Sequence, residues 1–143
     1  MPITGLLALT VAAMFTGAAF YVGFAEQPAR LLLGDRTQLE QWKPSYRRGF
    51  TMQASLAIIG FVFGVAAWLS SGHIAWLLGA LVLVANWPYT LYFIKPTNDA
   101  LNATPLNAAG PHSRELIQAW GNLHAGRTGL GAAATVLFIW AAT

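Results

Sequence analysis

The sequence predicts an all-α integral membrane protein, a four-helix bundle that forms a single domain over residues 1–143. The chain is 56% hydrophobic and only 9% charged, whereas soluble domains carry about 25% charged residues. A soluble domain of this length has too much surface for its volume to hide so many apolar side chains. A membrane-spanning helix needs about 20 mostly apolar residues. Four segments meet this requirement, at about residues 3–25, 45–71, 74–95 and 114–142.

The basic residues predict how the four spans are oriented. Loops rich in Lys and Arg stay on the cytoplasmic side of a membrane. We therefore expect both longer connections in the cytoplasm, at the level of the lipid headgroups, and both termini on the extracytoplasmic side. Only Arg127 falls deep inside a span. The other bases lie in the two longer connections or at the span ends that border them: Arg30, Arg36, Lys43, Arg47 and Arg48 around the first, and Lys95 and Arg114 around the second.

The first cytoplasmic connection is expected to contain a short interfacial helix. Thr37 and Glu40 have the spacing of a capping box, in which each side chain satisfies a free backbone N–H of the other. This helix should end near Lys43. Pro44 then suits the first turn of the second span, where its missing N–H costs nothing.

The second connection carries similar signals. Pro96 is expected to end the third span, because proline cannot continue a helix from its interior. Thr97 would cap a short helical turn that reaches Leu101. Ser113 is the expected N-cap of the fourth span.

Small residues predict close packing of the helices. Gly60 and Gly64 are one turn apart in the second span, and Gly121, Ala125 and Gly129 repeat at the same spacing in the fourth. Such faces let helix backbones approach in lipid, where no hydrophobic force drives helices together. The same faces could also join copies of the chain in a homo-oligomer.

The polar residues of the fourth span form one stripe. Trp120, His124, Arg127 and Gly131 follow the spacing i, i+4, i+7, i+11 of one helix face. Arg127 lies 13 residues beyond Arg114, about 20 Å along the helix. Ionisable residues inside a membrane usually face the bundle interior and serve a function. We therefore expect His124 and Arg127 in a buried site.

The other spans place polar and aromatic residues at the same depth, near their cytoplasmic ends. The sequence therefore predicts one polar, aromatic-lined pocket in the cytoplasmic half of the bundle. Pro88 is expected to kink the third span beside it. Its further expected lining residues are Tyr21 and Glu26 from the first span, Tyr46, Arg47 and Gln53 from the second, and Asn86, Tyr89 and Phe93 from the third.

Less specific interpretations compete with this pocket. Tyr46 fits a belt of interfacial aromatic residues, and Arg47 fits an anchor to lipid headgroups. The pairing of His124 with Arg127 could also be structural. Nucleic-acid binding is disfavoured, since the net charge is only +3 and the bases flank apolar runs. The absence of cysteine excludes disulfides and thiolate metal sites in this chain.

Four separated motifs follow one another along the whole chain. They are Glu26-x-Pro28-x-Arg30; Trp42-Lys43-Pro44-Ser45-Tyr46-Arg47-Arg48-Gly49; Pro88-Tyr89-Thr90 followed by Pro96-Thr97-Asn98; and Trp120-Gly121-Asn122-Leu123-His124-x-x-Arg127-Thr128-x-Leu130-Gly131. Together they resemble the anthrone oxygenase family of small membrane proteins. Characterised members oxidise anthrones to anthraquinones, and most bacterial members have no assigned substrate. The resemblance implies O2 as co-substrate, a lipophilic aromatic ligand, no required cofactor, the bacterial inner (plasma) membrane as location, and Asn98 as a further binding residue.

Anthrone oxidation requires a base, a group that stabilises an oxyanion, and a flat apolar slot. His124 is the expected base, since imidazole has an unperturbed pKa near 6.5. Arg127 is the expected stabiliser of the anthranolate oxygen. Tyr89, together with Asn86, would hydrogen-bond the substrate carbonyl. The expected stacking residues are Trp120, Phe93 and Tyr21.

Two other classes of function stay open from the sequence. His124 could ligate a haem iron or, with Glu26, a copper or iron ion, although metal sites normally use three or more ligands. The protein could also be a non-enzymatic binder of a lipid, a quinone or another small molecule, or an accessory subunit. Such a binder would have the same pocket without turnover.

Overall fold

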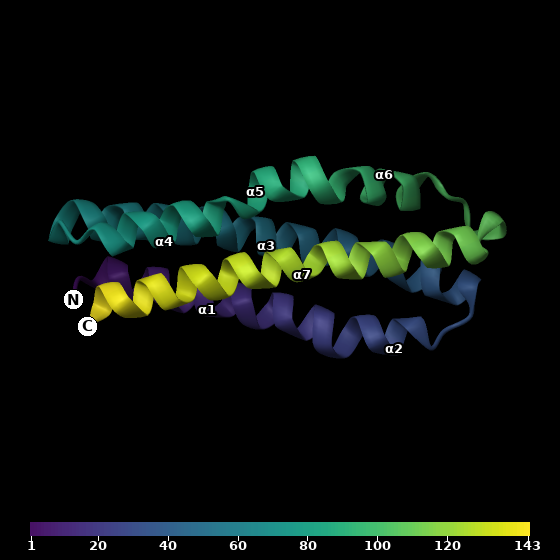
Figure 1. Cartoon of the computed structure of the whole chain (residues 1–143), viewed down its shortest axis with the longest axis horizontal. Helices are drawn as coiled ribbons and strands as arrows, with labels where there is room; N and C mark the ends of the chain where they lie inside the picture. The colour runs from purple at the N-terminus through teal and green to yellow at the C-terminus, as the bar shows by residue number, and fades with distance from the viewer.

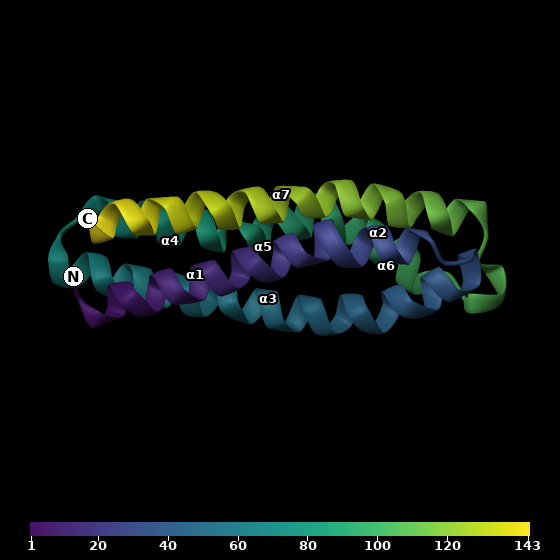
Figure 2. The same ribbon diagram turned by 90° about the horizontal axis from the view of Figure 1, so that it is seen from below.

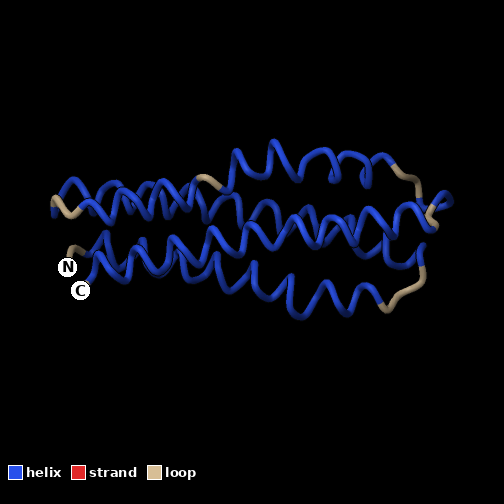
Figure 3. The backbone as a smooth tube through the Cα atoms, in the orientation of Figure 1, coloured by secondary structure: helices blue, strands red, loops and turns tan.

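Four helical rods run along the protein, as the computed structural model shows for all 143 residues (Figure 1). No strand is present, and short loops join the rods (Figure 3). All four rods are long and apolar enough to cross a membrane, which confirms the predicted all-α class and the four candidate spans. The first rod contains α1 (Ile3–Tyr21), the π-helical turn η1 (Val22–Glu26) and α2 (Gln27–Leu31); the second is α3 (Asp35–Ser71); the third contains α4 (Ile74–Val84), α5 (Asn86–Tyr89), the π-helical turn η2 (Thr90–Ile94) and α6 (Lys95–Ala103); the fourth is α7 (Pro111–Ala142), which follows the 3₁₀ turn η3 (Leu106–Ala108).

Both termini lie at the same end of the bundle, beside the turn between α3 and α4 (Figures 1 and 2). That turn is tight because Gly72 adopts the left-handed conformation, with φ 73°, which glycine adopts without steric cost. The two longer connections, and the basic residues around them, lie at the opposite end. The predicted up-and-down order of the spans is therefore present. Which end faces the cytoplasm stays a prediction from the charges.

The expected interfacial helix in the first connection is not a separate element. α3 is continuous from Asp35 to Ser71, with Gly34 as its N-cap and Pro44 inside it. Leu39 and Trp42 are completely buried in this first part of α3, and their packing offsets the backbone hydrogen bond that Pro44 cannot make.

Arg114 from α7 also binds the first connection and keeps it short. It makes an ion pair with Asp35 (2.5 Å) and donates hydrogen bonds to the carbonyl oxygens of Leu31 (3.1 Å) and Leu33 (2.6 Å). Leu31 is the last residue of α2 and Leu33 lies just beyond it, where backbone acceptors lack partners within the helix. The connection therefore has no room for an additional helix.

The second connection differs from expectation in three ways. Thr97 does not cap a short turn, because it lies inside α6, whose N-cap is Ile94. Pro96 does not end the third rod, because it lies in the first turn of α6, where its missing N–H is not needed. α7 begins at Pro111 rather than after Ser113. Ser113 is the third residue of that helix, and its hydroxyl accepts a hydrogen bond from the N–H of Gly110 (3.0 Å).

The third rod bends earlier than its proline suggests. α4 ends at Val84, and Ala85 separates it from α5, so that α5 and η2 lie further from the bundle axis than α4 does (Figures 1 and 3). Pro88 falls within α5, one turn after the break. A proline removes a hydrogen bond to the turn before it, which accounts for a break on that side.

Two separate hydrophobic cores hold the rods together. The core near the termini is rich in alanine, which allows close approach of the helices. The core near the longer connections is built from larger side chains. A band of polar residues lies between them. The first core consists of Ala8, Ala12, Phe15, Ala19, Ala57, Ala67, Trp76, Ala80, Leu83, Ala134 and Phe138, and the second of Leu39, Trp42, Ile94, Leu101, Ile117 and Trp120.

The close packing of the first core can be tested at Gly64. A Cβ added there would lie 2.8 Å from the Cβ of Ala80 and 3.0 Å from the ring of Phe138, so α3 and α4 would have to separate. Gly64→Ala should therefore lower the free energy of unfolding by about 1–3 kcal/mol, the usual cost of overpacking. Thermal melting in detergent micelles, followed by circular dichroism, measures this loss.

Gly129→Ala is the matched control, because nothing lies within 4 Å of its added Cβ and alanine is the better helix former. Its melting temperature should equal or exceed that of the wild type. Equal melting temperatures for Gly64→Ala and the wild type would contradict the close packing. The close helix packing that we expected at Ala125 and Gly129 is therefore absent within the chain, since both residues are exposed. The homo-oligomer stays a prediction.

Candidate functional site

A polar cavity of about 30 Å³ lies between the two cores. It has room for a molecule of about the size of water, and it is too small for a fused-ring compound in this arrangement of side chains. Six of the predicted site residues line it: Tyr46, Gln53, Asn98, Trp120, His124 and Arg127. Sequence reasoning did not include its other lining residues, which are Val22, Ser45, Gly49, Phe50 and Ile94.

The two π-helical turns lie beside this cavity and determine which side chains face it. In the third rod, residues spaced by four are buried from Asn86 through Thr90 and Ile94 to Asn98. A regular α-helix would advance by about 40° at each such step. The wider π turn at η2 reduces this drift, so that one face stays turned toward the bundle. π turns inside helices are frequently found at functional sites.

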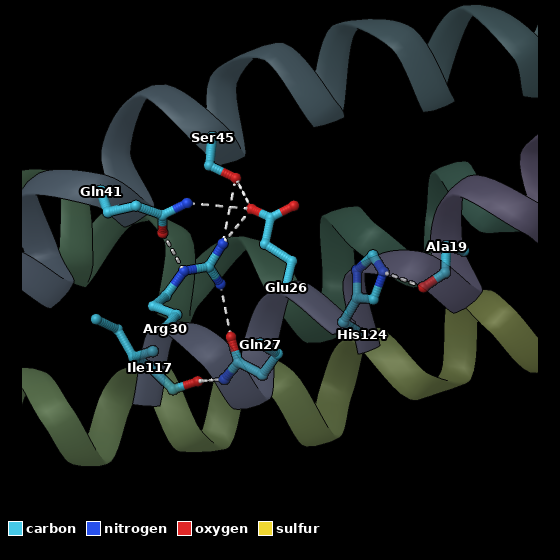
Figure 4. A network of polar contacts seen from close by, with 8 residues as sticks. All are labelled: Ala19, Glu26, Gln27, Arg30, Gln41, Ser45, Ile117 and His124. Atoms are coloured by element: carbon cyan, nitrogen blue, oxygen red, sulfur yellow. Dashed lines mark hydrogen bonds and ion pairs between the residues drawn. The ribbon is translucent and has the colours of Figure 1, made fainter. Parts of the chain in front are cut away.

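His124 is buried, with 4% of its surface exposed. Its Nε2 lies 3.3 Å from the carbonyl oxygen of Ala19 (Figure 4). A carbonyl oxygen only accepts hydrogen bonds, so Nε2 carries the hydrogen. In the neutral ring Nδ1 then holds the lone pair, and Nδ1 has no hydrogen-bond partner in the protein. His124 is therefore oriented so that its basic nitrogen is available to a ligand.

Arg127 is buried, with 6% of its surface exposed, and it has no acidic partner. The three ion pairs of the protein involve Arg30, Lys95 and Arg114 instead. The guanidinium lies 5.7 Å from the ring centroid of Phe15, and its Nε makes no hydrogen bond. A buried charge without a partner costs several kcal/mol. A buried cation in this position can bind an electron-rich group.

Other polar atoms around Arg127 also lack partners. The side-chain oxygens of Gln53, Asn86 and Thr90 are buried and make no hydrogen bond. The Asn86 amide nitrogen is bonded, to the carbonyl oxygen of Leu83 at 3.0 Å. Buried polar groups are normally paired, so this cluster is suited to a ligand that offers both donors and acceptors.

A second buried arginine, Arg30, is fully bonded (Figure 4). It donates to one oxygen of Glu26 (2.6 Å), to Gln27 (2.6 Å), to Gln41 (2.5 Å) and to Ser45 (3.2 Å). The Ser45 hydroxyl donates to the same Glu26 oxygen. The network joins the first rod to α3, and it occupies the Glu26 carboxylate that we expected in the pocket.

Trp120 connects this network to the cavity. The Arg30 guanidinium carbon lies 5.4 Å from the centroid of one face of the Trp120 ring system, and His124 stacks on Trp120 with centroids 5.0 Å apart. The indole N–H donates to the side-chain oxygen of Asn98 (2.9 Å). Trp120 is thus fixed in position and in turn fixes the plane of the His124 ring. Sequence reasoning did not assign Arg30 to the site, although its spacing of four residues from Glu26 is that of a helical ion pair.

Six predicted site residues do not line the cavity. Asn86 lines a narrow gap beside Arg127, and Glu26 belongs to the network around Arg30. The other four lie elsewhere. Tyr21 and Phe93 are each 60% exposed on the outside of the bundle, and Arg47 is also exposed. The Tyr89 hydroxyl donates to the backbone oxygen of Leu123 (2.6 Å), so it ties the third rod to α7. The physical reason for the exposed rings is that lipid accepts aromatic side chains as readily as a protein core does, whereas close helix contacts require small residues.

The structure brings together no group of three or more His, Asp or Glu side chains that could hold a metal ion. Glu26, the expected second ligand beside His124, is bonded to Arg30. Haem ligation by His124 stays an alternative.

A comparison with protein families matches residues 42–137 to the model described as anthrone oxygenase. The matched region covers about two thirds of the chain and includes His124, Arg127 and the other polar residues of the cavity, whereas Glu26 and Arg30 precede it. No curated protein and no solved structure matches the chain. Membership of such a family implies an oxygenase-like function. The match over this length shows that the chain belongs to the anthrone oxygenase family.

Proposed function

We propose that the protein oxidises a lipophilic aromatic substrate, anthrone- or quinol-like, with O2 at the site formed by His124 and Arg127. The observation that carries this proposal is the unpaired charge of Arg127, beside a histidine whose Nδ1 is free. An anthrone is neutral and dissolves in lipid, and it becomes an oxyanion when it loses a proton. The site offers a base for that proton and a cation for that oxygen.

The proposed reaction begins with proton transfer from the carbon between the two aromatic rings, opposite the carbonyl, to Nδ1 of His124. The resulting anthranolate places its negative charge on the carbonyl oxygen, which Arg127 stabilises. The anion transfers one electron to O2, and the two radicals join to form a carbon–oxygen bond. After the peroxide is protonated, the O–O bond breaks and water leaves. One oxygen atom remains as the second carbonyl of the anthraquinone, and both hydrogens of the carbon leave in water.

Oxygen uptake by the purified protein in lipid nanodiscs tests this function. With anthrone present, uptake should exceed that of empty nanodiscs with the same anthrone, and one anthraquinone should form for each O2 consumed. Binding of anthrone without oxygen uptake above the blank would contradict the oxidation and would indicate a non-enzymatic binder. An absorption spectrum of the same preparation between about 350 and 700 nm would show a bound haem.

His124→Ala should lower turnover about a hundredfold, the lower part of the range for general base catalysis, because the anthrone proton is already acidic. The fold should persist, since the side chain makes a single hydrogen bond of 3.3 Å. His112→Ala is the matched control, because His112 is exposed at the start of α7. Normal turnover in His124→Ala would exclude His124 as the base.

The location of the site is proposed from the charges. The cavity lies in the half of the bundle nearer the basic connections, and by the positive-inside rule this half belongs to the cytoplasmic leaflet of the bacterial inner membrane.

A further inference from the structure

A lipid-facing groove leads from the outer surface toward Arg127. It lies between α3 and α5, has a volume of about 510 Å³, and is lined by Ser55, Ile58 and Ile59 among others. At its inner end lies a narrow gap of about 10 Å³ that reaches Asn86, Thr90 and Arg127. Phe50, Ala54 and Trp87 line both spaces, so the groove and the gap adjoin. Phe50 and Arg127 also line the polar cavity beside His124.

The break in the third rod produces this groove. α4 ends at Val84, and α5 is displaced outward from the line of α4 (Figure 1), so it covers α3 less closely. The groove is at membrane depth, because Ser55 lies 16 residues before Ser71, about 24 Å along α3, and the hydrocarbon core is about 30 Å thick. The part of the groove around Ser55 and Ile59 therefore opens toward lipid.

Two aromatic rings separate the groove from the buried site. Phe50 and Trp87 lie edge to face, with centroids 6.4 Å apart. Trp87 is fixed, because its indole N–H donates to the backbone oxygen of Ala54 (3.2 Å). Phe50 has no hydrogen-bonding atom in its side chain, and its second aromatic neighbour is Tyr46, with centroids 6.0 Å apart. Phe50 is the one residue that lines the groove, the gap and the polar cavity.

The chemistry along this path fits one kind of ligand. The outer part is apolar, since the hydroxyl of Ser55 is bonded within its own helix, to the carbonyl oxygen of Thr51 (2.7 Å). The inner end presents the unpaired guanidinium of Arg127 and the unpaired side-chain oxygens of Asn86 and Thr90, and no carboxylate. A molecule that matches both ends is a flat apolar ring system with an electron-rich oxygen at its leading edge.

We propose that the groove between α3 and α5 is the portal through which the aromatic substrate passes from the lipid to Arg127, with Phe50 as its gate. This proposal rests on the proposed function, since the substrate is the same. The substrate displaces the Phe50 ring and comes to rest with its carbonyl oxygen at Arg127, the carbon opposite that oxygen toward His124, and one outer ring extending back past Trp87 into the groove. The proposal accounts for the small volume of the cavity, because Phe50 closes the site when no substrate is bound.

A competing groove provides the control. It lies between the first rod and α7, has a volume of about 850 Å³, and is lined by Phe24, Gly121 and Ala125 among others. It does not share a lining residue with the polar cavity. A substrate that entered there would have to pass the packed contact between Gln27 and Gly121.

Single cysteines can distinguish the two routes, because the chain contains no natural cysteine. Ser55→Cys reports on the proposed portal, Ile59→Cys gives a second position in it, and Ala125→Cys reports on the competing groove. Each variant is reconstituted in nanodiscs and labelled with N-phenylmaleimide, with and without 9,10-anthraquinone as the bound ligand. At about ten times its dissociation constant, anthraquinone should slow labelling of Ser55→Cys and Ile59→Cys about tenfold, by occupancy alone. Labelling of Ala125→Cys should not change.

Protection at the two portal positions supports the proposal, and protection only at Ala125→Cys, or at none of the three, overturns it. The gate is tested by the rate at which anthraquinone quenches tryptophan fluorescence. Phe50→Ala should raise the association rate several-fold, whereas Phe24→Ala should leave it unchanged, and the reverse result would overturn the portal. Protection without oxygen uptake would leave the portal standing and remove the proposed function. Oxygen uptake without protection would leave the proposed function standing and overturn the portal.

Discussion

Arg127→Met should lower turnover about 10²–10³-fold, the usual cost of removing a group that stabilises a developing oxyanion, and should leave the protein at least as stable as the wild type. Both effects have one cause. The guanidinium is buried without an acidic partner, and its Nε makes no hydrogen bond. A methionine of similar length fills the space without a charge, and replacing buried charge with apolar side chains is often neutral or stabilising by about 1–4 kcal/mol.

Turnover and melting temperature should be measured on the same nanodisc preparations. Arg127→Lys is the conservative control, because it keeps the charge and loses the planar group that can bind an oxygen through two N–H donors. We expect its turnover between those of the wild type and Arg127→Met. A melting temperature of Arg127→Met that falls by many degrees would contradict the account, since it would show that Arg127 mainly holds the fold together.

Arg30→Met should have the opposite effect on stability, with a loss of about 3–5 kcal/mol, because removing one partner of a buried ion pair leaves the other charge uncompensated. Arg30 bonds to four side chains, among them Glu26, Gln27 and Gln41. The double variant Glu26→Gln, Arg30→Met should recover part of the loss, since it removes the stranded carboxylate.

Thermal melting of the wild type, both single variants and the double variant forms a double-mutant cycle that isolates the coupling between Glu26 and Arg30. Activity should fall only as far as the folded fraction does, apart from any shift of the Trp120 ring beneath Arg30. Two buried arginines in one bundle thus lead to opposite predictions, because one is fully bonded and the other is not. Similar stability changes for Arg30→Met and Arg127→Met would contradict this division of roles.

The sequence was sufficient to predict the four apolar rods and the placement of His124 and Arg127 on one face, where both line the cavity. The rods follow from the apolar composition of the four segments. The shared face of the two residues follows from their spacing in one long regular helix. The rest of the site depends on the π turns at η1 and η2. Nothing in the local sequence indicates where a helix widens by one residue, so the faces drawn from regular spacing placed Tyr21 and Phe93 inside.

The buried face of the first rod was also not predictable from the sequence. Its buried face carries Ala8, Ala12, Phe15 and Ala19, and its large aromatic residues Phe20 and Phe24 face outward. In a soluble protein such large aromatic side chains would indicate the buried face. In a membrane protein lipid can surround them, so they do not show which face is buried. The first connection was mispredicted for a different reason. Pro44 was expected to begin a helix, but a proline inside a helix is tolerated where tertiary packing is strong, as it is beside Trp42.

The most direct test of the central claim is an experimental structure of the protein in lipid with 9,10-anthraquinone bound. The account predicts one carbonyl oxygen about 2.7–3.1 Å from the guanidinium of Arg127, the usual distance for such a donor, with the rings lying between α3 and α5 and the Phe50 ring turned aside. Anthraquinone bound only in the groove between the first rod and α7, or a haem coordinated by His124, would contradict it.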